Sequence, residues 1–177
     1  VSLKMDRYSE LYGEEAEWTD TQQVCLNGHV ITDYAVSQPA TTRKHCPDCG
    51  AETITACTNC GSTLRGYRHI PGVIGLSASF VGKLCPDCGK PYPWTEAERA
   101  VVLEWIGSLP SLQEASKEEM IRLLPAIFSD TPRTSFACHR LLNILRELPE
   151  EESAPFLTTL VDVACVSAAT QLRQAPD

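Results

Sequence analysis

The sequence predicts an α+β fold, in which short antiparallel strands come first and a small all-α unit of about four helices follows. Two observations predict the first part. Seven of the nine cysteines lie between Val24 and Gly89, and glycine and proline punctuate short β-branched runs in this stretch. A third observation predicts the second part: beyond Pro93, helix-capping patterns and apolar residues at helical spacing replace the cysteines.

These changes in character divide the chain into three segments. Residues 1–23 are polar and acidic, and we expect a partly ordered lead-in with a helical turn or two. Residues 24–94 carry the cysteine pairs and have too few large apolar residues to fold on hydrophobic burial alone. This domain therefore needs cross-links such as disulfides or bound metal ions. Residues 95–177 form the expected helical domain.

Four close pairs of metal-binding side chains can provide these cross-links. Structural zinc is held by four cysteine or histidine ligands at the corners of a tetrahedron, and two short-range pairs make one such set. Four pairs therefore predict two structural Zn²⁺ ions with no open position. A disulfide framework fits less well, because the pairs have knuckle spacing and no signal-peptide pattern opens the chain. The predicted ligands are Cys25, His29, Cys46, Cys49, Cys57, Cys60, Cys85 and Cys88.

Three of the pairs share the pattern Cys-x-x-Cys-Gly. The run from Cys46 to Gly50 recurs almost unchanged from Cys85 to Gly89, and the run from Cys57 to Gly61 has the same spacing. Two intervening residues let both sulfur atoms reach one ion from a tight turn. The glycine allows a positive φ angle, so the chain can turn back beneath the metal.

The remaining pair, Cys25 and His29, has three residues between its ligands, with Gly28 allowing the turn. If His29 were an ordinary surface histidine, the pair Cys46 and Cys49 would have no partners, so we favour ligation. His45 is the second choice, because it adjoins Cys46 and its ring would have to fold back to reach the same ion.

The order of the pairs leaves two arrangements open. Sequential pairing gives two tandem zinc ribbons with loops at 30–45 and 61–84, both of ordinary ribbon length. Cross-braced pairing joins the first pair with the third and the second with the fourth, as in RING-type ubiquitin ligases. A RING places its histidine in the middle pairs, whereas here the histidine closes the first, so we predict sequential ribbons.

The longer loop is the candidate partner-binding segment. It contains a cationic and aromatic cluster followed by an apolar run, and an unsupported apolar loop tip indicates contact with another molecule. The alternative is that this loop packs against the helices as core. The candidate partner-binding residues are Arg65, Tyr67, Arg68, Ile74 and Phe80.

Capping patterns predict where the helices begin. Thr95 with Glu98, Ser116 with Glu119 and Ser111 with Glu114 read as capping boxes, and Thr131 and Ser153 read as N-caps. Pro125 should kink or end the second helix. The helices are expected near 96–107, 117–129, 132–148 and 154–173.

Charge and composition exclude several function classes. The net charge is −8, and residues 96–177 hold thirteen acidic residues against seven Lys and Arg, which is no basic footprint for nucleic acid. No apolar run is long enough to span a bilayer, so we expect a soluble, cytoplasmic protein. No catalytic set stands out and closed zinc sites cannot activate water, so we do not expect an enzyme.

Three stretches resemble a bacterial family of uncharacterised zinc-ribbon proteins, known only as a domain of unknown function. They are Val24–Thr32, Arg65–Tyr67 and Cys88–Glu96, and the turn at Thr131–Thr134 is similar as well. The resemblance implies a cytosolic bacterial protein with zinc ribbons and a helical C-terminal region. It implies no activity.

These observations predict a zinc-stapled protein-interaction module or adaptor whose protein partner the sequence does not name. The alternative is a nucleic-acid-binding zinc ribbon, a common use of this architecture that the acidic charge disfavours. Self-association through the C-terminal helices is a further arrangement that the sequence leaves open.

Overall fold

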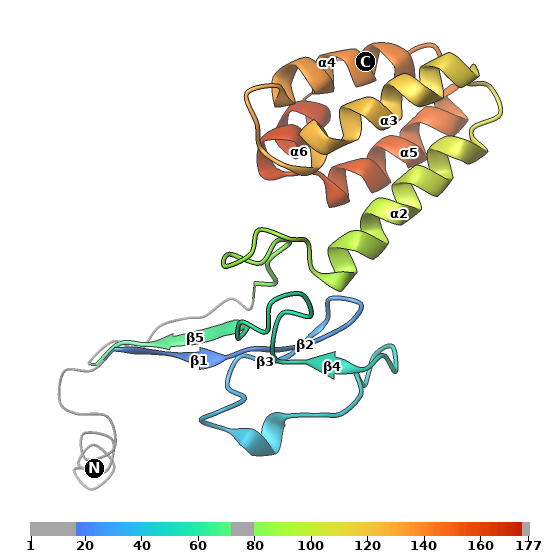
Figure 1. Ribbon diagram of the computed structural model, residues 1–177. Coiled ribbons are helices and arrows are strands. Elements are labelled where there is room, and N and C mark those ends of the chain that lie inside the picture. Colours follow the sequence, from blue (N-terminus) through green and yellow to red (C-terminus); the bar gives the residue numbers. More distant parts are fainter. Residues whose placement is uncertain (1–16, 72–79, 175–177) are drawn as a thin grey trace, which may run out of the picture. The chain divides into compact units, whose positions relative to one another are not determined.

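The computed structural model describes residues 17–71 and 80–174. The chain divides into two compact units, Val1–Thr95 and Glu96–Asp177. In the described residues, short antiparallel strands make up the first part of the chain and five helices follow (Figure 1), which confirms the predicted α+β class. The lead-in turns expected before residue 17 lie outside the described residues.

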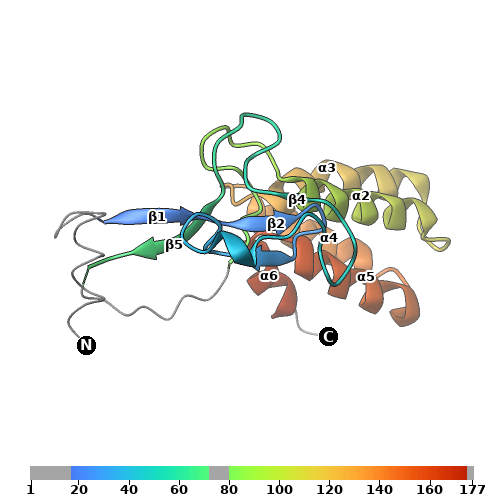
Figure 2. The same cartoon turned by 90° about the horizontal axis from the view of Figure 1, so that it is seen from below.

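Two small antiparallel sheets form the described part of the first unit. One pairs β1 (Trp18–Thr21) with β5 (Arg65–His69), which run side by side in Figure 2. The other has the order β3-β2-β4, with β2 (Gln23–Cys25) between β3 (Val30–Thr32) and β4 (Thr53–Ile54). The β-branched runs that predicted β3 and β4 therefore do form strands.

The central strand β2 positions the metal-binding turns. All three of its residues are buried. Val24 pairs with Val30 on one side and with Ile54 on the other. The β2–β3 hairpin carries the first ligand pair at its tip, and β4 lies between the second and third pairs. A short 3₁₀ helix, η1 (Pro39–Thr41), lies in the loop between β3 and the second pair.

One small apolar cluster lies between the ribbons of the first unit. Two ligand cysteines are part of it, so this core and the metal-binding groups are built from the same residues. Few other apolar side chains are buried here, which agrees with the expectation that hydrophobic burial alone would not hold this domain. The cluster comprises Val24, Cys57, Leu64, Cys85, Tyr92 and Trp94, with Ile54 and Val81 packed against it.

The helices run from α2 to α6, and residues of all five contribute to a second, larger apolar core. In the second unit α3 packs on α4, and α6 packs on both α4 and α5. Its largest fully buried side chains include Phe156, Ile106 and Met120. None of the described helices combines the length and apolar character that crossing a bilayer requires. The bounds are α2 (Pro93–Ser108), α3 (Glu114–Phe128), α4 (Thr134–Leu145), α5 (Glu150–Val163) and α6 (Val166–Arg173).

The helix boundaries differ from the capping predictions. Thr95 lies inside α2, and its hydroxyl donates to the carbonyl of Lys83 instead of capping a helix. Ser116 and Ser153 also lie inside helices, and the hydroxyl of Ser111 donates to Glu152 on α5. These four side chains therefore make tertiary contacts or lie in the first turn of a helix, whereas the hydroxyl of Thr131 does accept the N–H of Arg133 (3.2 Å) directly before α4.

Proline positions and the final helix also depart from expectation. α3 continues three residues past Pro125, so this proline does not end the helix early. The predicted helix over 154–173 is two helices, because Ala164 and Cys165 adopt extended conformations. The N–H of Cys165 donates to the carbonyl of Ile127 on α3 (2.9 Å), which replaces an intrahelical bond.

Candidate metal centres

The three Cys-x-x-Cys turns have the same backbone hydrogen bonds. In the turn at Cys46, the N–H of Gly50 donates to the carbonyl of Cys46 (2.9 Å) and the N–H of Cys46 donates to the carbonyl of Ala51 (2.8 Å). The turns at Cys57 and Cys85 repeat both bonds at 2.8–2.9 Å. Gly50 has a φ angle of 72°, as the predicted turn back beneath the metal requires.

The turn at Cys25 has the same two backbone hydrogen bonds, but each spans one residue fewer than in the other three turns. The N–H of Gly28 donates to the carbonyl of Cys25, and the N–H of Cys25 donates to the carbonyl of His29, both at 2.9 Å. Glycine therefore precedes the second ligand here, whereas it follows the second ligand in the other three turns. The φ angle of Gly28 is 88°.

The eight predicted ligands form two groups of four. Cys25, His29, Cys46 and Cys49 make the first group, with ligand atoms all within 4.8 Å of one another. In this group the sulfur atoms of Cys25 and Cys49 are 3.8 Å apart, and Nδ1 of His29 is 3.5 Å from the sulfur of Cys46. All four are close enough to contact one ion, so the group could bind a metal.

The second group contains Cys57, Cys60, Cys85 and Cys88, again with sulfur atoms within 4.8 Å of one another. The Cys57–Cys88 separation is 3.9 Å and the Cys60–Cys85 separation is 3.7 Å. These distances are far longer than the roughly 2.05 Å of a disulfide bond. The grouping follows sequential pairing and not the cross-braced alternative, and His45 belongs to neither group.

Hydrogen bonds and mutual repulsion govern the ionisation of the thiols. The backbone N–H of Ala51 lowers the pKa of Cys49 to about 6, and the backbone N–H of Cys88 lowers the pKa of Cys85 to about 6. Although the N–H of Lys90 lowers the pKa of Cys88, burial and the neighbouring thiols raise it to about 12. Four thiols in contact cannot all ionise without a cation, so these groups are suited to a divalent metal.

In each pair the first ligand is buried and the second lies nearer the surface. The buried cysteines Cys57 and Cys85 belong to the ribbon core beside Trp94 and Tyr92. The rings of Tyr92 and Trp94 stack at 4.7 Å, and the indole N–H of Trp94 donates to the carbonyl of Gly82 (2.9 Å). Aromatic side chains from the end of the second ribbon thus cover its metal-binding group.

Trp94 also contacts the first turn. A Cβ atom on Gly28 would lie 3.2 Å from both Cβ and Cγ of Trp94, so this glycine makes room for the tryptophan. Gly50, Gly61 and Gly89 have nothing within 4 Å of the corresponding position. The two metal-binding groups therefore share one packed side chain.

The two arginines among the candidate partner-binding residues lie close to carboxylates. Arg65 lies 3.7 Å from Asp87 in the fourth turn, and Arg68 forms an ion pair with Glu17 next to β1. Both arginines are thus paired with carboxylates of the same unit. Surface pairs of this kind contribute little to stability, but they lower the net positive charge available to a partner.

Tyr67 belongs to an aromatic cluster and not to a cationic one. Its ring lies 5.1 Å from that of Tyr34 and 4.8 Å from that of His69, which stacks on Trp18 at 4.1 Å. The partner-binding prediction for Ile74 falls outside the described residues. Phe80 is described and its side chain is 79% exposed.

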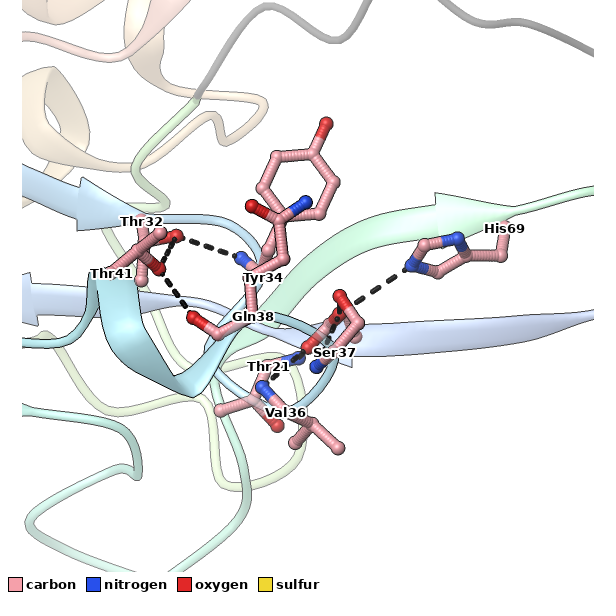
Figure 3. A network of polar contacts seen from close by, with 9 residues as sticks. Thr21, Thr32, Tyr34, Val36, Ser37, Gln38, Thr41 and His69 are labelled. Atoms are coloured by element: carbon pink, nitrogen blue, oxygen red, sulfur yellow. Dashed lines mark hydrogen bonds and ion pairs between the residues drawn. The ribbon is translucent and has the colours of Figure 1, made fainter. Parts of the chain in front are cut away.

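A buried carboxylate that the sequence did not point to organises this region. Asp20 is 2% exposed and accepts hydrogen bonds from the backbone N–H groups of Thr21 (2.7 Å), Val36 (2.9 Å) and Ser37 (3.2 Å). The hydroxyl of Ser37 and Nε2 of His69 contact the same group (Figure 3). Burial raises the pKa of Asp20, but these hydrogen bonds lower it by more, so the pKa lies below its ordinary value.

Two buried glutamines were not predicted from the sequence either: Gln22 directly precedes β2, and Gln23 is its first residue. Gln22 donates to the side chain of Asp33 (2.7 Å) and to the carbonyl of Phe80 (3.2 Å). Gln23 bonds both the N–H and the carbonyl of Arg43. The one available signal was two successive glutamines, separated from the ligand Cys25 by Val24 alone, and this pattern does not distinguish buried side chains from a solvated turn.

Comparison with known proteins identifies the family. The profile of a family described as "Uncharacterized protein conserved in bacteria (DUF2321)" matches residues 18–172. The chain belongs to this family. This confirms the predicted resemblance to uncharacterised bacterial proteins, whereas the metal-binding character is supported by the two cysteine groups. No curated protein and no solved structure matches the chain.

Proposed function

We propose that the protein holds two structural zinc ions and acts as a protein-interaction module or adaptor. The ligand separations carry the metal assignment. With Zn–S bonds of about 2.3 Å, tetrahedral geometry sets the sulfur atoms about 3.8 Å apart and a sulfur and a nitrogen about 3.5 Å apart. The sulfur pairs here measure 3.7–3.9 Å, and the pair of His29 and Cys46 measures 3.5 Å.

The ligand count supports a structural role. Each group supplies four protein ligands, so a tetrahedral ion has no position left for water or substrate. When bound, zinc would supply the cross-links that the small ribbon core lacks, and the free energy of binding would become free energy of folding. The residues around it then have only to orient the ligands, as the backbone N–H groups in each turn do.

X-ray absorption spectroscopy at the zinc edge tests this assignment. Because one group has three sulfurs and one nitrogen and the other has four sulfurs, the average shell should hold 3.5 sulfur and 0.5 nitrogen atoms per zinc ion. Sulfur should lie at about 2.3 Å and nitrogen at about 2.0 Å. Iron in place of zinc, or oxygen in the shell, would contradict the proposal.

The interaction role has support from Phe80. Its side chain is 79% exposed, while its carbonyl accepts a hydrogen bond from the buried Gln22, so an aromatic side chain is presented on a fixed backbone. Aromatic residues are enriched in protein interfaces. Ile70, nearby in the sequence, is 40% exposed.

Nucleic-acid binding has less support as the alternative. Arg65 and Arg68, the two arginines of the predicted cationic cluster, pair with Asp87 and Glu17. Proteins that bind single-stranded nucleic acid usually combine a positively charged groove with aromatic side chains on which the nucleobases stack. The net charge of −8 argues against such a groove.

Co-purification from the native host tests the interaction role. Tagged wild-type protein is compared with Phe80→Asp and with Val166→Asp, whose target side chain is 85% exposed on α6 in the other unit. We expect a defined protein to be lost with Phe80→Asp and retained with Val166→Asp. If both variants retain the same proteins as the wild type, Phe80 is not part of an interface.

A further inference from the structure

A pocket of about 410 Å³ lies beside the first metal-binding group and takes no part in the function proposed above. It is bordered by β2, by β4 and by the segment that leads into Cys46. Its volume is within the range of small-molecule sites, roughly 300–1,000 Å³. The lining residues are Gln23, Thr42, Arg43, Lys44, His45, Glu52 and Thr53.

The pocket carries a concentration of basic groups in an acidic protein. Arg43, Lys44 and His45 are the only three consecutive Lys, Arg or His residues in the sequence, and all three are exposed. In the described part of the chain none of them forms an ion pair, whereas Arg65 and Arg68 of the same unit do. The positive charges of Arg43 and Lys44 are therefore available to a ligand.

The buried side chain of Gln23 holds the backbone of Arg43 in place. Gln23 is 8% exposed, its Oε1 accepts from the N–H of Arg43 (2.9 Å) and its Nε2 donates to the carbonyl of Arg43 (2.9 Å). The N–H of Thr53 donates to the carbonyl of Lys44 (3.2 Å). Pre-organisation of this kind lowers the entropy cost of binding.

The guanidinium of Arg43 is held at one nitrogen only. Its Nη1 donates to the carbonyls of Ala40 (2.9 Å) and Thr42 (2.8 Å). Within the described residues Nε and Nη2 of Arg43 make no hydrogen bond, so the other edge of the guanidinium can donate to an anion. Arginine recognises phosphate through two parallel N–H groups, and Lys44 adds a second positive charge.

Glu52 restricts what the anion can be. Glu52 lines the same pocket, and its backbone forms an antiparallel bridge with that of His45. It would repel a second phosphate, which disfavours a nucleic-acid strand, and it can accept hydrogen bonds from hydroxyl groups. A phosphate group alone fills only a small part of 410 Å³.

We propose that this pocket binds a small phosphate monoester, with the phosphate on Arg43 and Lys44 and a hydroxyl-bearing body facing Glu52. The occupant is a sugar phosphate or a molecule of that chemistry. Inorganic phosphate could bind Arg43 and Lys44 in the same way, but it has no hydroxyl-bearing sugar to contact Glu52. We therefore expect it to bind more weakly than the sugar phosphate.

Titration of the full-length, metal-loaded protein followed by amide NMR tests the proposal, with ribose 5-phosphate, inorganic phosphate and ribose as probes at constant ionic strength. We expect saturable shifts at residues 43–45 and 52–53 with both anions and none with ribose. Arg43→Gln should weaken ribose 5-phosphate about tenfold, the loss expected for one charge-assisted hydrogen bond. Lys44→Gln should also weaken it, and because the exposed Lys44 side chain forms no hydrogen bond or ion pair with the described residues, folding should be unaffected.

Two further variants separate charge from specificity. Arg133→Gln removes an exposed arginine of the helical unit that pairs with no carboxylate among the described residues, and it should leave binding unchanged. Glu52→Gln should strengthen inorganic phosphate and reduce the preference for ribose 5-phosphate over it. The proposal is overturned if neither anion gives saturable shifts, if Arg43→Gln and Lys44→Gln bind as the wild type does, or if a single-stranded oligonucleotide binds there more tightly than ribose 5-phosphate.

Discussion

Substituting Gly28 with alanine should disrupt the first metal-binding turn more than the same substitution at Gly50. Both glycines have positive φ angles, 88° and 72°, so each alanine carries a left-handed backbone cost of about 1–2 kcal/mol. Only Gly28 faces a packed neighbour, because its added Cβ would lie 3.2 Å from Trp94 whereas Gly50 has nothing within 4 Å.

The size of the difference follows from how firmly Trp94 is held. It is 5% exposed, stacks on Tyr92 and donates its indole N–H to Gly82, so it cannot move away without losing these contacts. Overpacking a site of this kind costs about 1–3 kcal/mol. Gly28→Ala should therefore lower the free energy of unfolding by about 2–5 kcal/mol, against about 1–2 kcal/mol for Gly50→Ala.

Urea denaturation of the metal-loaded variants measures these values, and competition with a chromogenic chelator measures metal retention. Gly89→Ala in the second metal-binding group serves as another control, since its φ angle is 71° and nothing lies within 4 Å. Gly28→Ala should release metal at lower chelator concentrations than either control. Equal stability of the three variants would refute the argument that Trp94 packs against the first turn.

Two other predictions concern the β1–β5 region. A Cβ atom added at Gly66 would lie 2.7 Å from the carbonyl carbon of Thr21 and 2.8 Å from the N atom of Gln22. Gly66→Ala should therefore lower the free energy of unfolding, measured by urea denaturation, by about 3 kcal/mol. A smaller loss than that of Gly50→Ala would contradict this close approach. Asp20→Asn should cost about 2 kcal/mol at neutral pH because a charged hydrogen-bond acceptor is lost, while the exposed Asp48→Asn should be neutral. Because hydrogen bonding holds the pKa of Asp20 below the unfolded value of about 3.9, its carboxylate stabilises the fold above that pH, and this stabilisation is lost as the pH falls through the folded pKa. The carboxyl ¹³C signal of Asp20 should accordingly stay constant between about pH 8 and about pH 5, and a titration midpoint inside that range would show that burial dominates.

The metal-binding groups were predictable because their information is local. Each turn is specified by ligand spacing and one glycine, and the loop lengths together with the position of His29 favoured sequential pairing over cross-bracing. The strands β3 and β4 were predictable for the same reason, since β-branched residues mark them directly.

Features that depend on distant partners were not predictable. The polar run Trp18–Thr21 becomes a strand only because Arg65–His69, more than forty residues later, pairs with it. That pairing, together with Glu17 and Asp87, divides the apparent cationic cluster into two ion pairs and an aromatic face. The break between α5 and α6 has no glycine or proline to mark it, and it depends on a hydrogen bond from Cys165 to Ile127.

Zinc content of double-serine variants tests most directly whether two independent four-ligand groups organise the first unit. The wild type should contain two equivalents of zinc. Cys25→Ser with Cys46→Ser removes two ligands of one group and should leave one equivalent, whereas Cys25→Ser with Cys57→Ser damages both groups and should leave none. One equivalent in the second variant and none in the first would show cross-braced pairing and contradict the account, as would a wild type that binds far less than two.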